Sequence, residues 1–131
     1  MAMQTEKLPE LRAIIFALHG AIETLEEPAR SMAETVAFKK EVDGIVFRVV
    51  DFTDAQLDFS NLVMGMAMEK QHEGGAFDPE VATIYVGVHD LVELGVRAFK
   101  EQEQYAGSNV IGLVSTRQEA LDLIRAQLAE E

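Results

Sequence analysis

Three short runs of consecutive apolar, largely β-branched residues, each followed by a stretch with helical spacing, constrain the fold of this chain most. The runs are residues 45–50, 81–88 and 109–114. A short run that is apolar on both faces is typical of a strand buried inside a parallel sheet. Strands joined through helices run parallel, with right-handed crossovers. The sequence therefore predicts an α/β fold in which helices flank a mostly parallel sheet.

Each run is followed by a segment whose apolar residues recur at helical spacing. The predicted helices cover residues 58–69, 90–104 and 116–128. The second begins at Asp90 and the third at Thr116, and each has a glutamate three residues further on. This is the capping-box spacing of a helix start. Together, the apolar runs and these helices predict that strand and helix alternate through most of the chain.

The N-terminal part of the chain allows two interpretations. Residues 11–18 hold three consecutive bulky residues that need burial on both faces, which favours a strand ending at Gly20. Apolar residues from Leu11 to Leu25 also fall at helical spacing, so a helix is the alternative. With the strand, residues 24–41 form the first helix, and the order is β-α-β-α-β-α-β-α with a roughly four-stranded sheet.

The chain is predicted to be one domain. Its 131 residues are enough to bury a sizeable core. No internal repeat, low-complexity tract or linker interrupts the pattern. We assign residues 1–9 to an N-terminal extension and residues 10–131 to a single α/β domain.

Charge and composition narrow the classes of partner. The net charge is −12, with 11 basic against 23 acidic residues, so binding to nucleic acid or phospholipid by phosphate neutralisation is disfavoured. The absence of cysteine removes disulfides and thiolate metal sites and fits a reducing compartment. No apolar run reaches the roughly 20 residues that a membrane helix needs. The sequence predicts a cytoplasmic protein with neither nucleic acid nor membrane as partner.

Polar residues near the carboxyl ends of the predicted strands are the candidates for a small-ligand site. Ligands of open parallel sheets collect at this edge, and imidazoles with carboxylates could bind a metal or transfer protons. No nucleotide-binding loop, nucleophile elbow or metal-binding histidine spacing accompanies them. We predict no catalytic residue, metal or cofactor, and keep a small-ligand or metal-binding enzyme as the alternative. These rim candidates are His19, Asp51, Asp58, His89 and Ser115.

The helix predicted at residues 58–69 is apolar around most of its circumference. Met64, Met66 and Met68 point in different directions, because residues two apart on a helix lie on opposite sides. We expect this helix to be covered on much of its surface by the sheet or by a second subunit. A homodimer is therefore predicted.

Residues 49–62 resemble the STAS family (sulfate transporter and anti-sigma antagonist domains). They read V-V-D-F-T-D-A-Q-L-D-F-S-N-L, against a family pattern of a buried strand, an Asp-containing turn and an Asp-Ser-Ser-Gly-Leu helix start. The similarity in organisation extends over residues 10–128, with Gly20 closing one strand and Gly87 inside another. The resemblance implies a non-enzymatic module that docks on a protein partner, an anti-sigma-type regulator, under the control of a phosphorylated serine.

The chain departs from the family pattern at the helix start. Aligning Asp58 with the family aspartate places Phe59 at the phosphorylated position, whereas aligning Ser60 with the phosphorylated serine places Leu62 on the glycine. Ser60 is therefore the phosphorylation candidate, and we predict that it is not a working switch. The edge strand usual in the family has at most residues 1–8 available.

Overall fold

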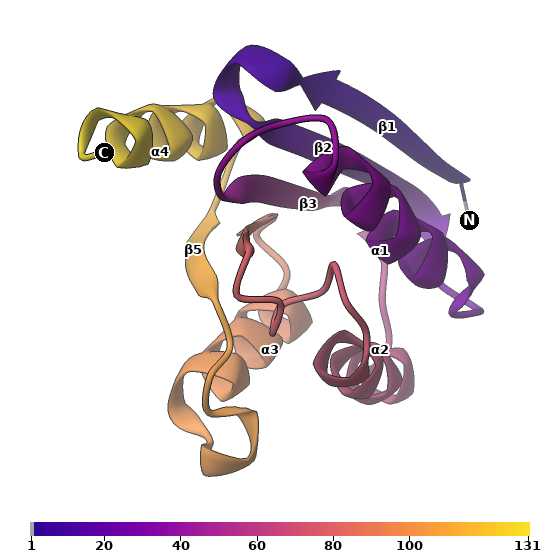
Figure 1. The fold of residues 1–131 in the computed structure, drawn as a ribbon. Helices are drawn as coiled ribbons and strands as arrows, with labels where there is room; N and C mark the ends of the chain where they lie inside the picture. Colours follow the sequence, from indigo (N-terminus) through magenta and orange to yellow (C-terminus); the bar gives the residue numbers. More distant parts are fainter. Residues whose placement is uncertain (1) are drawn as a thin grey trace.

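The computed structural model describes residues 2–131 and contains one five-stranded sheet in the order β1-β2-β3-β4-β5. Strands β2 to β5 run parallel, and β1 is antiparallel to β2 (Figure 1). The predicted α/β class is confirmed, with one strand more than expected. The elements are β1 Ala2–Leu8, β2 Ala13–Ala21, α1 Glu26–Lys39, β3 Val46–Gln56, α2 Phe59–Gln71, β4 Val81–Val86, α3 Asp90–Glu101, β5 Val110–Val114 and α4 Arg117–Ala129, with short 3-10 turns at Pro9–Leu11 and Glu103–Tyr105.

Of the two interpretations of the N-terminal part, the strand is correct. Ile14 and Phe16 are fully buried, and Ile15, which points to the other face of β2, is 1% exposed. A helix could not bury three consecutive bulky side chains on opposite sides within one layer. The bulky run is therefore the signal that distinguishes the two possibilities.

The fifth strand, β1, lies inside the predicted N-terminal extension. It pairs with β2 from Ala2 opposite His19 to Leu8 opposite Ala13. Most of its side chains are exposed, because it is an edge strand that covers no second layer. It lacks the apolar run that identified the other strands, which explains why the sequence predicted four.

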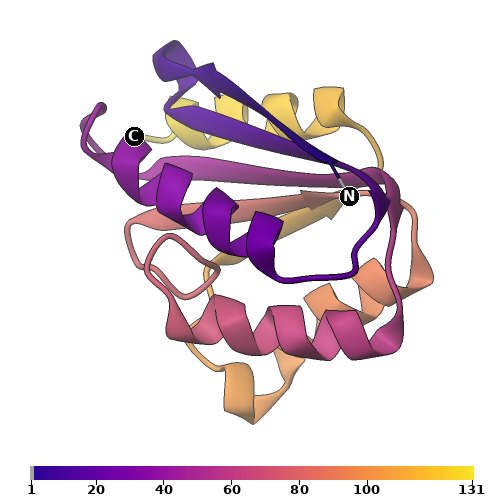
Figure 2. The ribbon, with the colours of Figure 1, turned by 90° about the vertical axis from the view of Figure 1, so that its right-hand side faces the viewer.

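The helices divide unequally between the two faces of the sheet. Helix α4 packs on one face, and α1, α2 and α3 lie on the other (Figure 2). On the α4 face, Val49 and Ile84 pack with Ile124. On the opposite face, Val50 and Tyr85 pack with the helices α2 and α3.

Three predicted boundaries are wrong. Strand β3 continues to Gln56, so Asp51 lies within the strand and not at its end. The N-cap of α3 is His89, and Asp90 is its first residue. Helix α1 begins at Glu26 and not at residue 24. The cap at Thr116 is confirmed, because its hydroxyl accepts a hydrogen bond from the Glu119 N–H at 3.2 Å.

Candidate functional site

Helix α2 exposes much of its apolar surface. Phe59 is 61% exposed, Val63 46% and Met64 49%. With Ser60 and Ala67, which are also exposed, they occupy one continuous arc, since residues three or four apart are neighbours on a helix. We call these five residues the outer face of α2. The sheet alone does not cover much of this helix, because only Met66 among its residues is buried. Cover by a second subunit stays a prediction.

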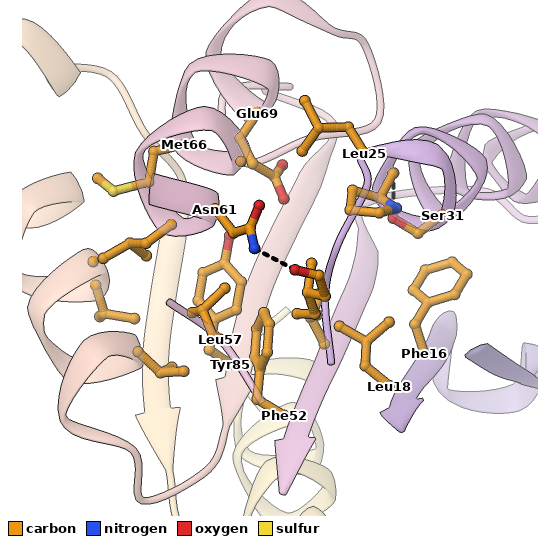
Figure 3. Close-up of a pocket in the computed structure, with 18 of the residues that line it drawn as sticks. Phe16, Leu18, Leu25, Ser31, Phe52, Leu57, Asn61, Met66, Glu69 and Tyr85 are labelled. Carbon is orange, nitrogen blue, oxygen red and sulfur yellow. Dashed lines mark hydrogen bonds between the residues drawn. The ribbon is translucent and has the colours of Figure 1, made fainter. Parts of the chain in front are cut away.

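The opposite arc of α2 lines a cavity between α1, α2, α3 and the sheet. Its volume is about 90 Å³. Val50, Phe52 and Tyr85 contribute its floor from the sheet, and Asn61 and Glu69 point toward it from α2 (Figure 3). Apart from a few polar groups, the walls are apolar. The other lining residues are Phe16, Leu18, Ile22, Leu25, Pro28, Ser31, Leu57, Leu62, Gly65, Met66, Val92, Gly95, Val96 and Phe99.

A buried ion pair lies at one end of the cavity. The Arg48 side chain is completely buried, and its Nη2 donates to both carboxylate oxygens of Glu69 at 2.9 Å. Arg48 Nε donates to Thr83 Oγ1 at 3.2 Å, and Nη2 lies 3.4 Å from the Tyr85 hydroxyl. Within residues 2–131, Arg48 Nη1 has no hydrogen-bond partner.

The ion pair decides the charge state of its members. Burial opposes the charge on Arg48, but the Glu69 carboxylate raises the pKa of the guanidinium, which therefore stays protonated. Burial raises the pKa of Tyr85 far above its usual value, so the phenol stays neutral. The net charge of Arg48, Glu69 and Tyr85 together is therefore close to zero.

The segment between α2 and β4 contacts Glu69 through the Ala76 N–H and is held by a second charge cluster. Lys39 Nζ lies 2.8 Å from Asp78 Oδ2, 2.9 Å from Glu73 and 3.2 Å from Glu80. Asp78 also accepts the Gly74 and Glu80 N–H groups at 2.9 Å each. Burial alone would raise the pKa of Asp78, but the Lys39 ammonium and these N–H donors hold it below its usual value.

Two helical glycines border the cavity, and they differ in what surrounds them. A methyl group on Gly95 would lie 2.8 Å from Leu62 Cδ1, so this glycine allows α2 and α3 to pack closely. A methyl group on Gly65 would meet nothing within 4 Å. A glycine inside a helix costs about 1 kcal/mol relative to alanine. At position 65, no neighbouring atom requires a glycine in place of alanine.

The rim residues predicted from the sequence share one edge of the sheet, and each of them has contacts or exposure of its own. Asp51 faces α4, accepts hydrogen bonds from Thr53 and lies 3.5 Å from Arg117. Asp58 caps α2 by accepting the Asn61 N–H at 2.8 Å. Both carboxylates thus have structural partners.

The remaining rim residues have other contacts. His89 Nε2 lies 3.0 Å from the Phe52 carbonyl oxygen. His19 Nδ1 lies 3.7 Å from Asp54, and Ser115 is exposed. Within residues 2–131, no three His, Cys, Asp or Glu side chains are close enough together to hold a metal ion.

The loops and first helical turns at the carboxyl edge are acidic. No lysine or arginine occurs in residues 13–29, 49–69 or 71–96. Arg117, in the first turn of α4, is engaged with Asp51 and Glu6. We call the following exposed set the acidic rim: Glu23, Glu26, Asp54, Asp58, Asp90 and Glu93.

The four parallel strands, the antiparallel edge strand, the single helix on one face and α2 beside the acidic rim define a STAS-like α/β domain. The solved structure of the anti-sigma factor antagonist SpoIIAA in its unphosphorylated form is similar, with a TM-score of 0.59. The alignment covers 95% of this chain and 98% of that chain at 16% sequence identity. The STAS resemblance of the sequence is thus confirmed at the level of the fold. No protein-family model and no curated protein matches the sequence.

None of the helices formed by residues 2–131 combines the length and the apolar character needed to cross a lipid bilayer.

Proposed function

We propose that this chain is a non-catalytic, regulatory protein-interaction module of the cytoplasm, and that it docks on its partner through the outer face of α2. The observation that carries the proposal is the exposure of Phe59, Val63 and Met64 on one arc of one helix. Clustered exposed apolar residues mark interaction sites more often than single ones. An exposed aromatic residue is also a typical anchor of an interface.

The charge around the outer face of α2 indicates the chemistry of the partner. Asp58 of the acidic rim directly precedes it as the N-cap of α2, and the 49–69 stretch contains no basic residue. Opposite charges around an apolar centre steer association and exclude wrong partners. The partner is therefore a protein with an apolar contact surface bordered by lysine and arginine, a description that an anti-sigma-type regulator would have to meet.

A second copy of this chain is the less favoured occupant, although a homodimer is predicted from the sequence. An isologous dimer through this surface would bring two acidic rims close together, on subunits that each carry −12 charges. Light scattering at low and high salt distinguishes the cases: we expect a monomer at low salt. A dimer that is lost in the Phe59→Asp variant would assign the surface to self-association.

Ser60 lies at the centre of the outer face of α2, yet its surroundings do not favour a phosphate switch. A phosphate at this position would have Asp58 nearby and no basic residue within the adjoining 49–69 stretch. Mass spectrometry after incubation with a kinase-active extract of the host should leave Ser60 unmodified. Stoichiometric phosphate on Ser60 would establish a switch.

Site-specific photo-crosslinking tests the docking proposal. A photoreactive residue replaces Val63 on α2 or, as the control, Gln118 on the exposed side of α4. We expect a crosslink to one discrete protein from position 63 and not from position 118. The crosslink should weaken with salt, and the crosslinked peptide of the partner should be rich in lysine and arginine.

Two substitutions that each introduce an aspartate complete the test. Phe59→Asp should abolish the crosslink, whereas Leu94→Asp should not, because Leu94 is exposed to 43% on α3, outside the outer face of α2. Equal crosslinking from positions 63 and 118, or a crosslink that survives Phe59→Asp, would contradict docking through α2.

A further inference from the structure

We propose that the cavity beneath α2 is a binding site for a small uncharged ligand that inserts an unbranched alkyl chain. This site lies on the inner side of α2 and does not depend on the docking of a protein on the outer face. The two proposals can therefore fail separately.

The space beside Gly65 is the first reason. Glycine destabilises a helix relative to alanine, and here an added methyl group would meet no atom within 4 Å. The neighbouring glycine, Gly95, has a packing reason, because Leu62 lies against it. A helix that keeps a glycine next to unfilled apolar space leaves room for atoms that the chain itself does not supply.

Three polar side chains of the cavity wall already have partners, which disfavours charge as the basis of recognition. The Ser31 hydroxyl donates to the Pro28 carbonyl at 2.7 Å, and the Asn61 amide donates to the Ile22 carbonyl. Both oxygens of Glu69 are taken by Arg48, and one also by the Ala76 N–H. In the described part of the chain, the unpartnered Arg48 Nη1 is completely buried, and Arg48 does not line the cavity, so a ligand carboxylate would meet the Glu69 carboxylate without an accessible cation. The ligand is therefore held by apolar burial.

The size of the cavity indicates the shape of the ligand. An apolar cavity of about 150 Å³ accommodates benzene, whereas this cavity measures about 90 Å³. A ring is too broad to be enclosed completely, whereas an alkyl chain can place its end in the cavity and leave its outer carbons in the opening. Leu25, Asn61 and Gly65 are partly exposed, so the space reaches the surface between α1 and α2, where an uncharged head group can stay in water.

Methyl NMR with two six-carbon probes tests this site. 1-Hexanol and hexanoate carry the same chain, and they differ in the charge of the head group. We expect 1-hexanol to cause saturable shifts at the methyl groups of Leu62 and Met66, while those of the exposed Met64 stay unchanged. Hexanoate should bind more weakly, because its carboxylate at the opening is repelled by a chain of net charge −12 that has no basic residue in the 49–69 stretch.

A graded substitution at position 65 shows whether the ligand occupies the cavity. Gly65→Ala should weaken 1-hexanol binding about fourfold, as expected for one methyl group of filled space. Gly65→Leu should weaken it at least about tenfold. Ala67→Leu is the control on the exposed side of α2 and should leave the affinity unchanged. Because the alanine variant is expected to fold at least as well as the parent chain, it keeps the test decisive if Gly65→Leu misfolds.

Three results would overturn the proposal. The first is 1-hexanol causing no saturable shift at Leu62 and Met66. The second is equal affinity in the parent chain and Gly65→Ala, which would place the probe elsewhere. The third is tighter binding of hexanoate than of 1-hexanol, which would contradict an uncharged ligand.

Discussion

The two faces of the sheet bury different kinds of side chain beneath their helices. Under α4, the sheet presents Val49, Ile84 and Val86, all completely buried, against Ala120 and Ile124. Under α1, α2 and α3, it presents the charged Arg48 and a cavity of about 90 Å³. The first face is an apolar core whose space lies in an open pocket at the end of α4, lined by Phe47, Ala82 and Gln127, whereas the second holds an ion pair and unfilled space beneath α2.

The difference shows where the chain has room for function. A close-packed apolar layer stabilises the fold and leaves little space for another molecule. The other layer carries α2, with an exposed apolar arc outside and an unfilled arc inside. Both proposed sites lie on this one helix.

The largest expected effect concerns the ion pair. Glu69→Leu leaves the buried Arg48 guanidinium without its carboxylate, so the free energy of unfolding should fall by about 3–5 kcal/mol. The double variant Arg48→Met with Glu69→Leu should recover most of this loss, since no buried charge remains unpaired. Urea unfolding measures both. A double variant as unstable as Glu69→Leu would show that the ion pair stabilises the fold by more than the mutual neutralisation of its two charges.

A pair of neighbouring valines compares the two faces directly. Val49 packs under α4, and Val50 borders the cavity. Val49→Ala should lower the free energy of unfolding by about 2–3 kcal/mol, and Val50→Ala by about 1–2 kcal/mol, because fewer packing contacts are lost beside existing space. Urea unfolding of both variants gives the comparison. Equal losses would mean that the faces are packed alike.

Asp78 should make stability depend on acid pH. Its folded-state pKa is lowered, so its contribution is complete above the unfolded value of about 3.9 and is lost as pH falls through the folded pKa. Asp78→Asn should cost about 1–2 kcal/mol at pH 7. It should also flatten the decline of the unfolding free energy below pH 4, as thermal unfolding across pH would show. An unchanged pH profile would contradict the role of the Lys39 cluster.

The smallest effect concerns Gly65. Gly65→Ala should raise the free energy of unfolding by up to about 1 kcal/mol, because the methyl group meets open space and the helix gains propensity. Gly74→Ala is the control with the opposite sign. Gly74 has a φ of 83°, and a methyl group there would lie 2.4 Å from the Met32 carbonyl oxygen. A loss of stability in Gly65→Ala would show that the space beside it is not available.

The sequence predicted the parallel strands because each is an apolar run. It missed β1, since an exposed edge strand has no such run, and it ended β3 too early, because Asp51 resembled a turn residue. Within β3 that carboxylate is held by Thr53 and Arg117, a contact between segments far apart in sequence.

The site was predictable only in part. The apolar excess of α2 was visible in the sequence, but which arc faces water depends on the positions of α1 and α3. Arg48, in the middle of an apolar run, was the visible sign of a buried partner such as Glu69. The unfilled space beside Gly65 had no sequence signal of its own.

The most direct test of the central claim, that the outer face of α2 is a docking surface, is the affinity of the crosslinked partner for two alanine variants. In titration calorimetry, Phe59→Ala should weaken binding at least about 30-fold, as for an interface anchor worth 2 kcal/mol. Leu94→Ala should change the affinity by less than about twofold. Equal affinities of Phe59→Ala and the parent chain would contradict the account.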